Sequence, residues 1–164
     1  MVGSLEFIKS ATGSSVNTLD IDDCFSDDYD VYFCTMTKVQ HITDANSPVK
    51  FRFKYSGGVD STSNYDYARI GMKAYGSFTE SRGTGSTSAL VSYANSQQDY
   101  QTGTRFYIYN PYDSSSYTFA LAQSSGYNSG SSGLFGVKQI SVHKVAEQIT
   151  GINFFPASGT YDNI

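Results

Sequence analysis

The segment from Val49 to Tyr55 alternates apolar and basic residues at every position. Such a period of two is typical of a β-strand, because successive side chains on a strand point to opposite faces of its sheet. A helix, which repeats every 3.6 residues, is excluded here. The apolar residues are expected to enter a core. The basic residues are expected on the outer face: Lys50, Arg52 and Lys54.

Short runs with the same spacing recur along the chain, and each predicts one strand. Their apolar residues are Leu5 and Phe7; Leu19 and Ile21; Ala68, Ile70, Met72 and Ala74; Phe106 and Ile108; Phe119 and Leu121; and Ile152 and Phe154. The connecting segments are rich in Gly, Asp and Ser, which favour turns. These segments are 57–58, 83–85, 113–116 and 126–133. Strands and turns at this spacing predict an all-β fold, namely an antiparallel two-sheet β-sandwich of the jelly-roll type.

The segment 31–39 is apolar at both odd and even positions. Such a pattern is typical of a strand buried on both faces, so we expect a central strand there.

The length of 164 residues is enough for one domain with its own core. We therefore expect a single domain over residues 1–164.

Composition argues against two classes of partner. The formal net charge is −4 and only 16% of residues are charged, whereas phosphate binding favours a basic excess, so no nucleic-acid partner is expected. No apolar run reaches 18 residues, so no membrane span is expected. The first residues lack the basic start and apolar stretch of a secretory signal, which predicts synthesis and folding in a cytosol.

Cys24 and Cys34 lie ten residues apart, beside neighbouring predicted strands. A disulfide between them is one alternative. A cytosolic origin and a core of ordinary size favour reduced, buried thiols instead. Neither cysteine has the His and Asn context that would make it a convincing nucleophile.

Residues 20–30 contain six aspartates in eleven positions. Calcium prefers several oxygen ligands, so a metal site is one interpretation. The glycine and distal glutamate of an EF-hand loop are missing. We favour a solvated turn in which aspartates accept backbone hydrogen bonds, and we predict no metal site.

The two histidines, His41 and His143, have no recognisable catalytic context. The chain contains no His-Glu-x-x-His, no Gly-x-Ser-x-Gly and no P-loop, and the segment 83–88 lacks the third glycine of a dinucleotide loop. Both histidines are therefore expected to be surface or satisfied structural residues. We predict a protein that is not an enzyme, with no catalytic residue and no cofactor.

The chain has 14 tyrosines and 11 phenylalanines but no tryptophan. Tyrosine offers a large contact area with few rotatable bonds, so it is common at interfaces. The candidate interface residues are Tyr107, Tyr109, Tyr112 and Tyr117. Cross-strand aromatic pairing within one sheet is an equal alternative, and glycan stacking is a third. The basic residues of the 49–55 strand are either a solvated face or a contact with an acidic neighbouring subunit.

A set of strand and turn motifs, in this order, resembles small virion structural proteins of tailed bacteriophages, including those of marine cyanobacteria. The resemblance covers nearly the whole chain. The motifs are Ser4-Leu5-Glu6-Phe7-Ile8; Tyr29-Asp30-Val31-Tyr32; Asn64-Tyr65-Asp66-Tyr67; Tyr109-Asn110-Pro111-Tyr112 with Ser116-Tyr117-Thr118-Phe119; and Ile149-Thr150-Gly151-Ile152-Asn153-Phe154 followed by Ser158-Gly159.

The resemblance implies a non-enzymatic component of a phage virion, assembled in the host bacterial cytoplasm. A capsid decoration or cement protein is our first expectation, with other virion proteins (the major capsid protein or tail proteins) or further copies as partners. A tail-fibre or tail-associated module, or a carbohydrate-binding domain for a host glycan, are the alternatives.

The resembling proteins begin a terminal strand where this sequence ends, at residues 161–164. We therefore expect either a truncated chain or a last strand that is lost or supplied by a neighbour. An unpaired edge is predicted beside residues 149–155.

Overall fold

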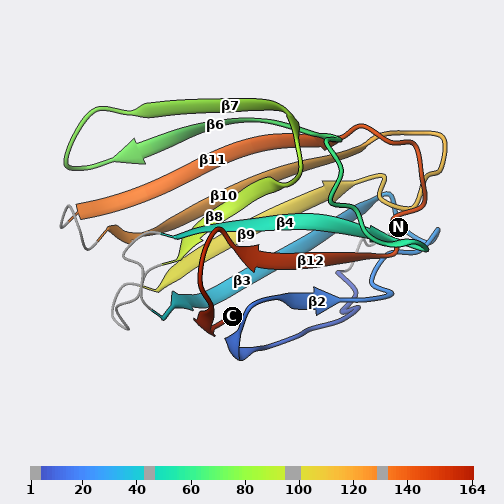
Figure 1. Ribbon diagram of the computed structural model, residues 1–164, viewed down its shortest axis with the longest axis horizontal. Coiled ribbons are helices and arrows are strands. Elements are labelled where there is room, and N and C mark those ends of the chain that lie inside the picture. The colour runs from blue at the N-terminus through green and yellow to red at the C-terminus, as the bar shows by residue number, and fades with distance from the viewer. Residues whose placement is uncertain (1–4, 43–46, 95–100, 129–132) are drawn as a thin grey trace.

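The computed structural model describes residues 5–42, 47–94, 101–128 and 133–164, which form two antiparallel sheets and no helix (Figure 1). The larger sheet has eight strands in the order β1-β13-β3-β9-β10-β11-β6-β7. Their bounds are β1 (Ser14–Val16), β3 (Val31–His41), β6 (Tyr65–Lys73), β7 (Thr79–Ser86), β9 (Thr102–Tyr109), β10 (Thr118–Asn128), β11 (Gly133–His143) and β13 (Tyr161–Asn163).

The smaller sheet has five strands, four of them in the order β2-β12-β4-β5, while β8 also pairs with β4. Their bounds are β2 (Leu19–Ile21), β4 (Ser47–Tyr55), β5 (Gly58–Val59), β8 (Ala89–Ala94) and β12 (Gly151–Pro156). In Figure 1, β4 and β12 overlie strands of the larger sheet. The core lies between the layers, where Phe106 of β9 meets Phe51 of β4 at 4.8 Å and Phe154 of β12 at 6.4 Å, between ring centroids. The predicted β-sandwich is confirmed, and its jelly-roll connectivity stays a prediction.

Strand β4 has the register that its alternation predicts. Val49, Phe51 and Phe53 are 0–1% exposed, while the basic residues between them face outward. Full burial of such side chains stabilises the fold by about 1.5–3 kcal/mol each. This strand therefore supplies a large part of the contact between the sheets.

Strand β3 is covered on one face only, so the predicted coverage on both faces is wrong. Tyr32 and Met36 face the core, whereas Val31 and Phe33 are 52% and 40% exposed. The register shifts between Met36 and Val39, where Lys38 has a φ of 60°. Such a bulge inserts one residue and exchanges the two faces. Val39 therefore lies in the core despite its odd position.

Strand β10 places its large apolar side chains outward. Phe119 is 47% exposed, whereas Ala120 and Ala122 are buried. These alanines pair with Ile108 and Phe106 of β9, so small side chains stand beside large ones on the inner face. The spacing of two predicted this strand correctly, but it did not indicate which face enters the core.

Two predicted local features are wrong. Residues 5–10 are not in a strand, and Leu5 and Phe7 are exposed. The predicted turn at 83–85 lies inside β7, which pairs with β6. The turn predicted at 113–116 is present. The prediction for 126–133 falls partly on residues 129–132, which lie outside the described residues.

The chain forms a terminal strand of its own. Strand β13 pairs with β1 on one side and β3 on the other. Backbone hydrogen bonds join Gly13 and Ile164 in both directions, at 2.8 and 3.0 Å. Strand β12 pairs with both β2 and β4, so the predicted unpaired edge beside 149–155 is wrong.

Candidate functional site

Apolar side chains gather on the solvent-facing side of the larger sheet. They come from β3, β9, β10 and β11 and form two cross-strand rows. The first row is Val31, Tyr109, Phe119 and Val142, and the second is Phe33, Tyr107, Leu121 and Ile140. We call these eight residues the outer apolar face.

The exposure of this face is high for such residue types. Ile140 is 59% exposed, Phe119 is 47% exposed and Tyr107 is 37% exposed. Large contiguous apolar patches on a protein surface mark sites of interaction with other molecules. The outer apolar face is therefore the candidate functional site.

Ring contacts within the face hold its aromatic side chains in place. Phe33 and Tyr107 lie 4.8 Å apart between ring centroids, and Tyr107 and Tyr109 stack at 6.5 Å. The cross-strand contact is the pairing that a period of two produces in an antiparallel sheet. These rings lose little side-chain freedom when a partner covers them, which lowers the entropic cost of binding.

Charged residues border the face. A third cross-strand row contains Arg105, Gln123 and Lys138, all exposed. The first row ends beyond Val142 at Asp66, whose carboxylate lies 2.9 Å from the Lys144 ammonium. The outer apolar face thus has a cationic border beside its second row.

The structure separates the four predicted interface tyrosines. Tyr107 and Tyr109 belong to the outer apolar face, and Tyr117 is 46% exposed just before β10. Tyr112 packs against the core cluster. The sequence prediction omitted Phe119, which the period of two had marked only as a strand residue. Its membership depends on cross-strand register, which one sequence does not show.

The basic residues of β4 lie on the outside of the smaller sheet. Lys54 forms ion pairs with Asp20 at 3.1 Å and Asp22 at 2.5 Å. Arg52 donates from Nε to the Thr87 carbonyl oxygen at 2.9 Å. Two of the three predicted basic contacts, Lys54 and Arg52, are thus engaged within the chain, and Lys50 lies on the same face. The acidic segment also contributes to this contact, because Asp20 belongs to β2.

Arg52 also lies over an aromatic ring. Its guanidinium carbon is 4.5 Å from the centroid of Phe155. This cation–π contact covers part of the ring on the outside of the smaller sheet. An acidic neighbouring subunit would have to compete with these contacts, so the outer apolar face is the better candidate.

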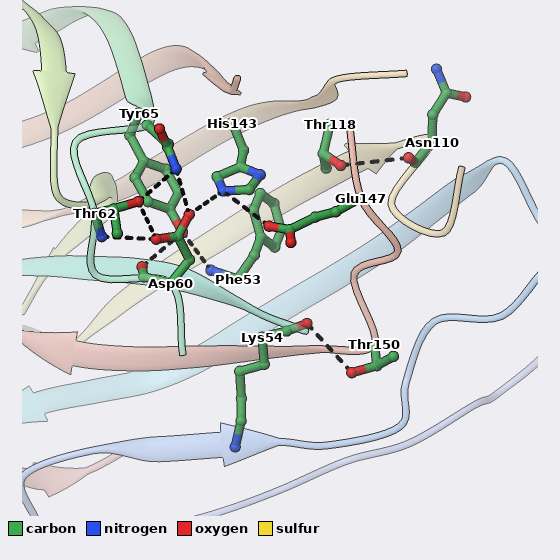
Figure 2. A network of polar contacts seen from close by, with 11 residues as sticks. Phe53, Lys54, Asp60, Thr62, Tyr65, Asn110, Thr118, His143, Glu147 and Thr150 are labelled. Carbon is green, nitrogen blue, oxygen red and sulfur yellow. Dashed lines mark hydrogen bonds and ion pairs between the residues drawn. The ribbon is translucent and has the colours of Figure 1, made fainter. Parts of the chain in front are cut away.

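A second cluster of polar side chains surrounds the buried residues Asp60 and His143, at the ends of β5, β6 and β11 (Figure 2). His143 Nε2 lies 2.5 Å from Asp60 Oδ2 and 3.8 Å from Glu147 Oε1. Thr62 donates its backbone N–H to Asp60 Oδ1 at 2.8 Å, and Asn64 Nδ2 donates to Asp60 Oδ2 at 3.1 Å. We call these five residues the buried polar cluster after Asp60 and His143, since Thr62 is exposed and Asn64 and Glu147 are half-buried.

Hydrogen bonds hold Asp60 in its ionised form. Burial alone would raise the pKa of Asp60, but hydrogen bonds from His143, Thr62 and Asn64 outweigh it and hold that pKa well below its usual range. Burial raises the pKa of Glu147. The Asp60 carboxylate is therefore stabilised by neighbouring donors.

The cluster offers three possible metal-ligand atoms within 4.8 Å of one another, two carboxylate oxygens from Asp60 and Glu147 and one imidazole nitrogen from His143. Both oxygens of Asp60 already accept hydrogen bonds from the chain, and His143 Nε2 faces the same carboxylate. A cation would have to displace these donors. The arrangement instead joins the end of β11 to the loop before β6, so we interpret the buried polar cluster as structural.

The other titratable residues singled out by the sequence also lie inward. His41 is fully buried, and its Nε2 lies 2.6 Å from the Ser158 carbonyl oxygen. Cys24 and Cys34 are free thiols. Burial raises the pKa of Cys24 to about 12 and that of Cys34 to about 11, which disfavours the reactive thiolate.

No family model, curated protein or solved structure matches this chain. Among the described residues, no helix combines the length and the apolar character needed to cross a membrane. The function is therefore inferred from the fold, the outer apolar face and the sequence motifs.

Proposed function

We propose that this chain is a non-enzymatic structural protein of a tailed-phage particle, a capsid decoration protein that binds neighbouring subunits through the outer apolar face. The observation that carries the binding role is the set of eight apolar side chains in register on a solvent-facing sheet. Aromatic residues at the centre of such a patch supply most of the energy in many protein interfaces.

The β-sandwich suits a role in which geometry matters more than chemistry. The buried polar cluster and the aromatic core fix the sheets, so the face is preformed rather than assembled on binding. A preformed surface avoids the ordering cost of a flexible one. Repeated on many copies, such contacts stabilise a particle through multivalency, even where each contact is modest.

The resemblance of the sequence motifs to virion structural proteins supports the phage context. The capsid position is favoured by the compact all-β architecture of the described residues, in which no helical or fibrous segment occurs. The same fold serves many binding roles, so the fold itself does not select this one.

The decisive variant is Phe119→Ser, with Phe78→Ser as its matched control. Both replace an exposed phenylalanine, 47% and 66% exposed, but only Phe119 belongs to the outer apolar face. We expect Phe119→Ser to lower occupancy on purified particles at least tenfold under limiting protein, while Phe78→Ser keeps it. A tenfold loss corresponds to about 1.4 kcal/mol of binding free energy.

Occupancy would be measured by quantitative mass spectrometry of purified particles, beside thermal melts of both isolated variants. Full occupancy of the Phe119→Ser chain would contradict the proposed binding surface. Saturable glycan binding that is lost in Tyr107→Ala would instead favour the carbohydrate-binding alternative.

A further inference from the structure

A second exposed apolar element lies in the segment 5–8. Leu5 is 87% exposed and Phe7 is 78% exposed, more than any other large apolar side chain among the described residues. Ile8 is 44% exposed. The sequence gives this segment a strand-like period of two, yet it forms no strand in the single chain.

Polar contacts hold this segment beside the body of the protein. The Tyr29 hydroxyl donates to the Glu6 carboxylate, and Lys9 Nζ donates to the Asp22 carbonyl oxygen at 2.6 Å. Tyr29 lies two residues before Val31, which begins the first row of the outer apolar face. The segment is thus anchored through its charged side chains, at Tyr29 just before β3 and at Asp22 beside the smaller sheet, while its apolar side chains remain in solvent.

We propose that the segment 5–8 of one copy docks on the outer apolar face of a second copy. This inference rests on the proposed function, because it names the neighbouring subunit that the face binds. Leu5 and Phe7 would cover the aromatic rows, as their spacing matches a strand laid on a flat sheet. Glu6 lies between them and would point away from the face, where its carboxylate keeps its contact with the Tyr29 hydroxyl of its own copy.

A face-to-face dimer would account for only one of the two exposed apolar elements. It would cover the outer apolar face of both copies but leave Leu5 and Phe7 in water. Docking of a segment on a face covers both apolar elements, because each copy carries one segment 5–8, the donor, and one outer apolar face, the acceptor. Such an interface is heterologous, so it links copies head to tail into rings or chains. A particle-stabilising protein would use these links to connect neighbouring positions.

Two double variants of the full chain separate donor from acceptor. Leu5→Ser with Phe7→Ser removes the segment's apolar side chains, and Phe119→Ser with Ile140→Ser removes those of the face. The wild-type chain is expected to associate with increasing concentration in sedimentation velocity. Each double variant alone is expected to be monomeric, with self-association weakened at least tenfold. The segment variant should keep the wild-type melting temperature, while the face variant, whose side chains are about half-buried, should lose no more than a few degrees.

The equimolar mixture of the two variants provides the specific test. One variant retains an intact face and the other an intact segment, so the mixture should form a 1:1 heterodimer. Phe78→Ser serves as the control for loss of an exposed ring and should associate as the wild type does. A mixture that stays monomeric overturns the inference.

Other outcomes also overturn it. If the segment variant still associates while the face variant does not, the contact is face to face. If the wild-type chain is monomeric at every concentration, the face does not bind a second copy. Loss of particle occupancy by Phe119→Ser would still support the proposed function in that case, so the two failures are distinguishable.

Discussion

Truncation of Phe53 to alanine tests the core of the sandwich directly. The ring is 1% exposed and lies 5.2 Å from the ring of Phe51, 6.4 Å from that of Tyr65 and 5.8 Å from that of His143, between centroids. Removing a fully buried phenylalanine loses its transfer free energy and leaves a cavity, which together cost about 3 to 5 kcal/mol. Because three rings lose a packing partner, we expect about 4 kcal/mol.

Phe119→Ala is the matched control, since it makes the same chemical change on the exposed side of the other sheet. The ring is 47% exposed, so its truncation removes only about half a ring of buried apolar area and leaves no enclosed cavity. We expect a loss of about 1 kcal/mol or less. Lys54→Ala, the neighbour on the opposite face of β4, should also cost less than about 1 kcal/mol, because partly exposed ion pairs contribute little.

Urea unfolding followed by far-UV circular dichroism would give the three free energies of unfolding. For a chain of this length, a loss of about 4 kcal/mol lowers the melting temperature by about 10 °C. Equal losses in Phe53→Ala and Lys54→Ala would refute the register of β4. Equal losses in Phe53→Ala and Phe119→Ala would refute the assignment of inner and outer faces.

Two further predictions concern titratable groups. Because neighbouring donors lower the pKa of Asp60 from its ordinary 3.8, its ionised form stabilises the fold above that pH, and this contribution is lost on acidification. Asp60→Asn should therefore show a smaller loss of stability between pH 5 and pH 2.5 than the wild type in urea titrations, and an unchanged acid dependence would contradict this. Cys24 and Cys34 should react slowly with iodoacetamide at pH 8 in the native protein and fully in urea, as followed by mass spectrometry. Rapid native labelling would show that burial does not protect them.

The alternation of 49–55 predicted both the strand and its inner face, because its two faces differ in charge as well as in apolar character. The runs at 119–121 and 68–74 predicted strands only. There the outward residues Phe119 and Ile70 are apolar, while the inner face includes Ala120 and Gly71. A period of two predicts a strand, but the face that enters the core depends on which side chains the opposite sheet packs against it.

The sequence did not indicate which residues far apart in the chain make contact. His143 and Asp60 are separated by 83 positions, and nothing in either local segment indicates that they meet. The bulge at Lys38 exchanges the faces of β3 within one residue, so Val31 and Val39 have opposite environments although their positions have the same parity. The outer apolar face required the register of four strands, which no single run contains.

The pairing of β1 with β13 also determines how the protein responds to tension. Gly13 and Ile164 stand side by side at the same end of this antiparallel pair. A pulling force applied between these two residues therefore loads the interstrand hydrogen bonds one after another, beginning at this end, and not all at once. β1 would peel from β13 at low force, while the stacked aromatic core carries none of that load.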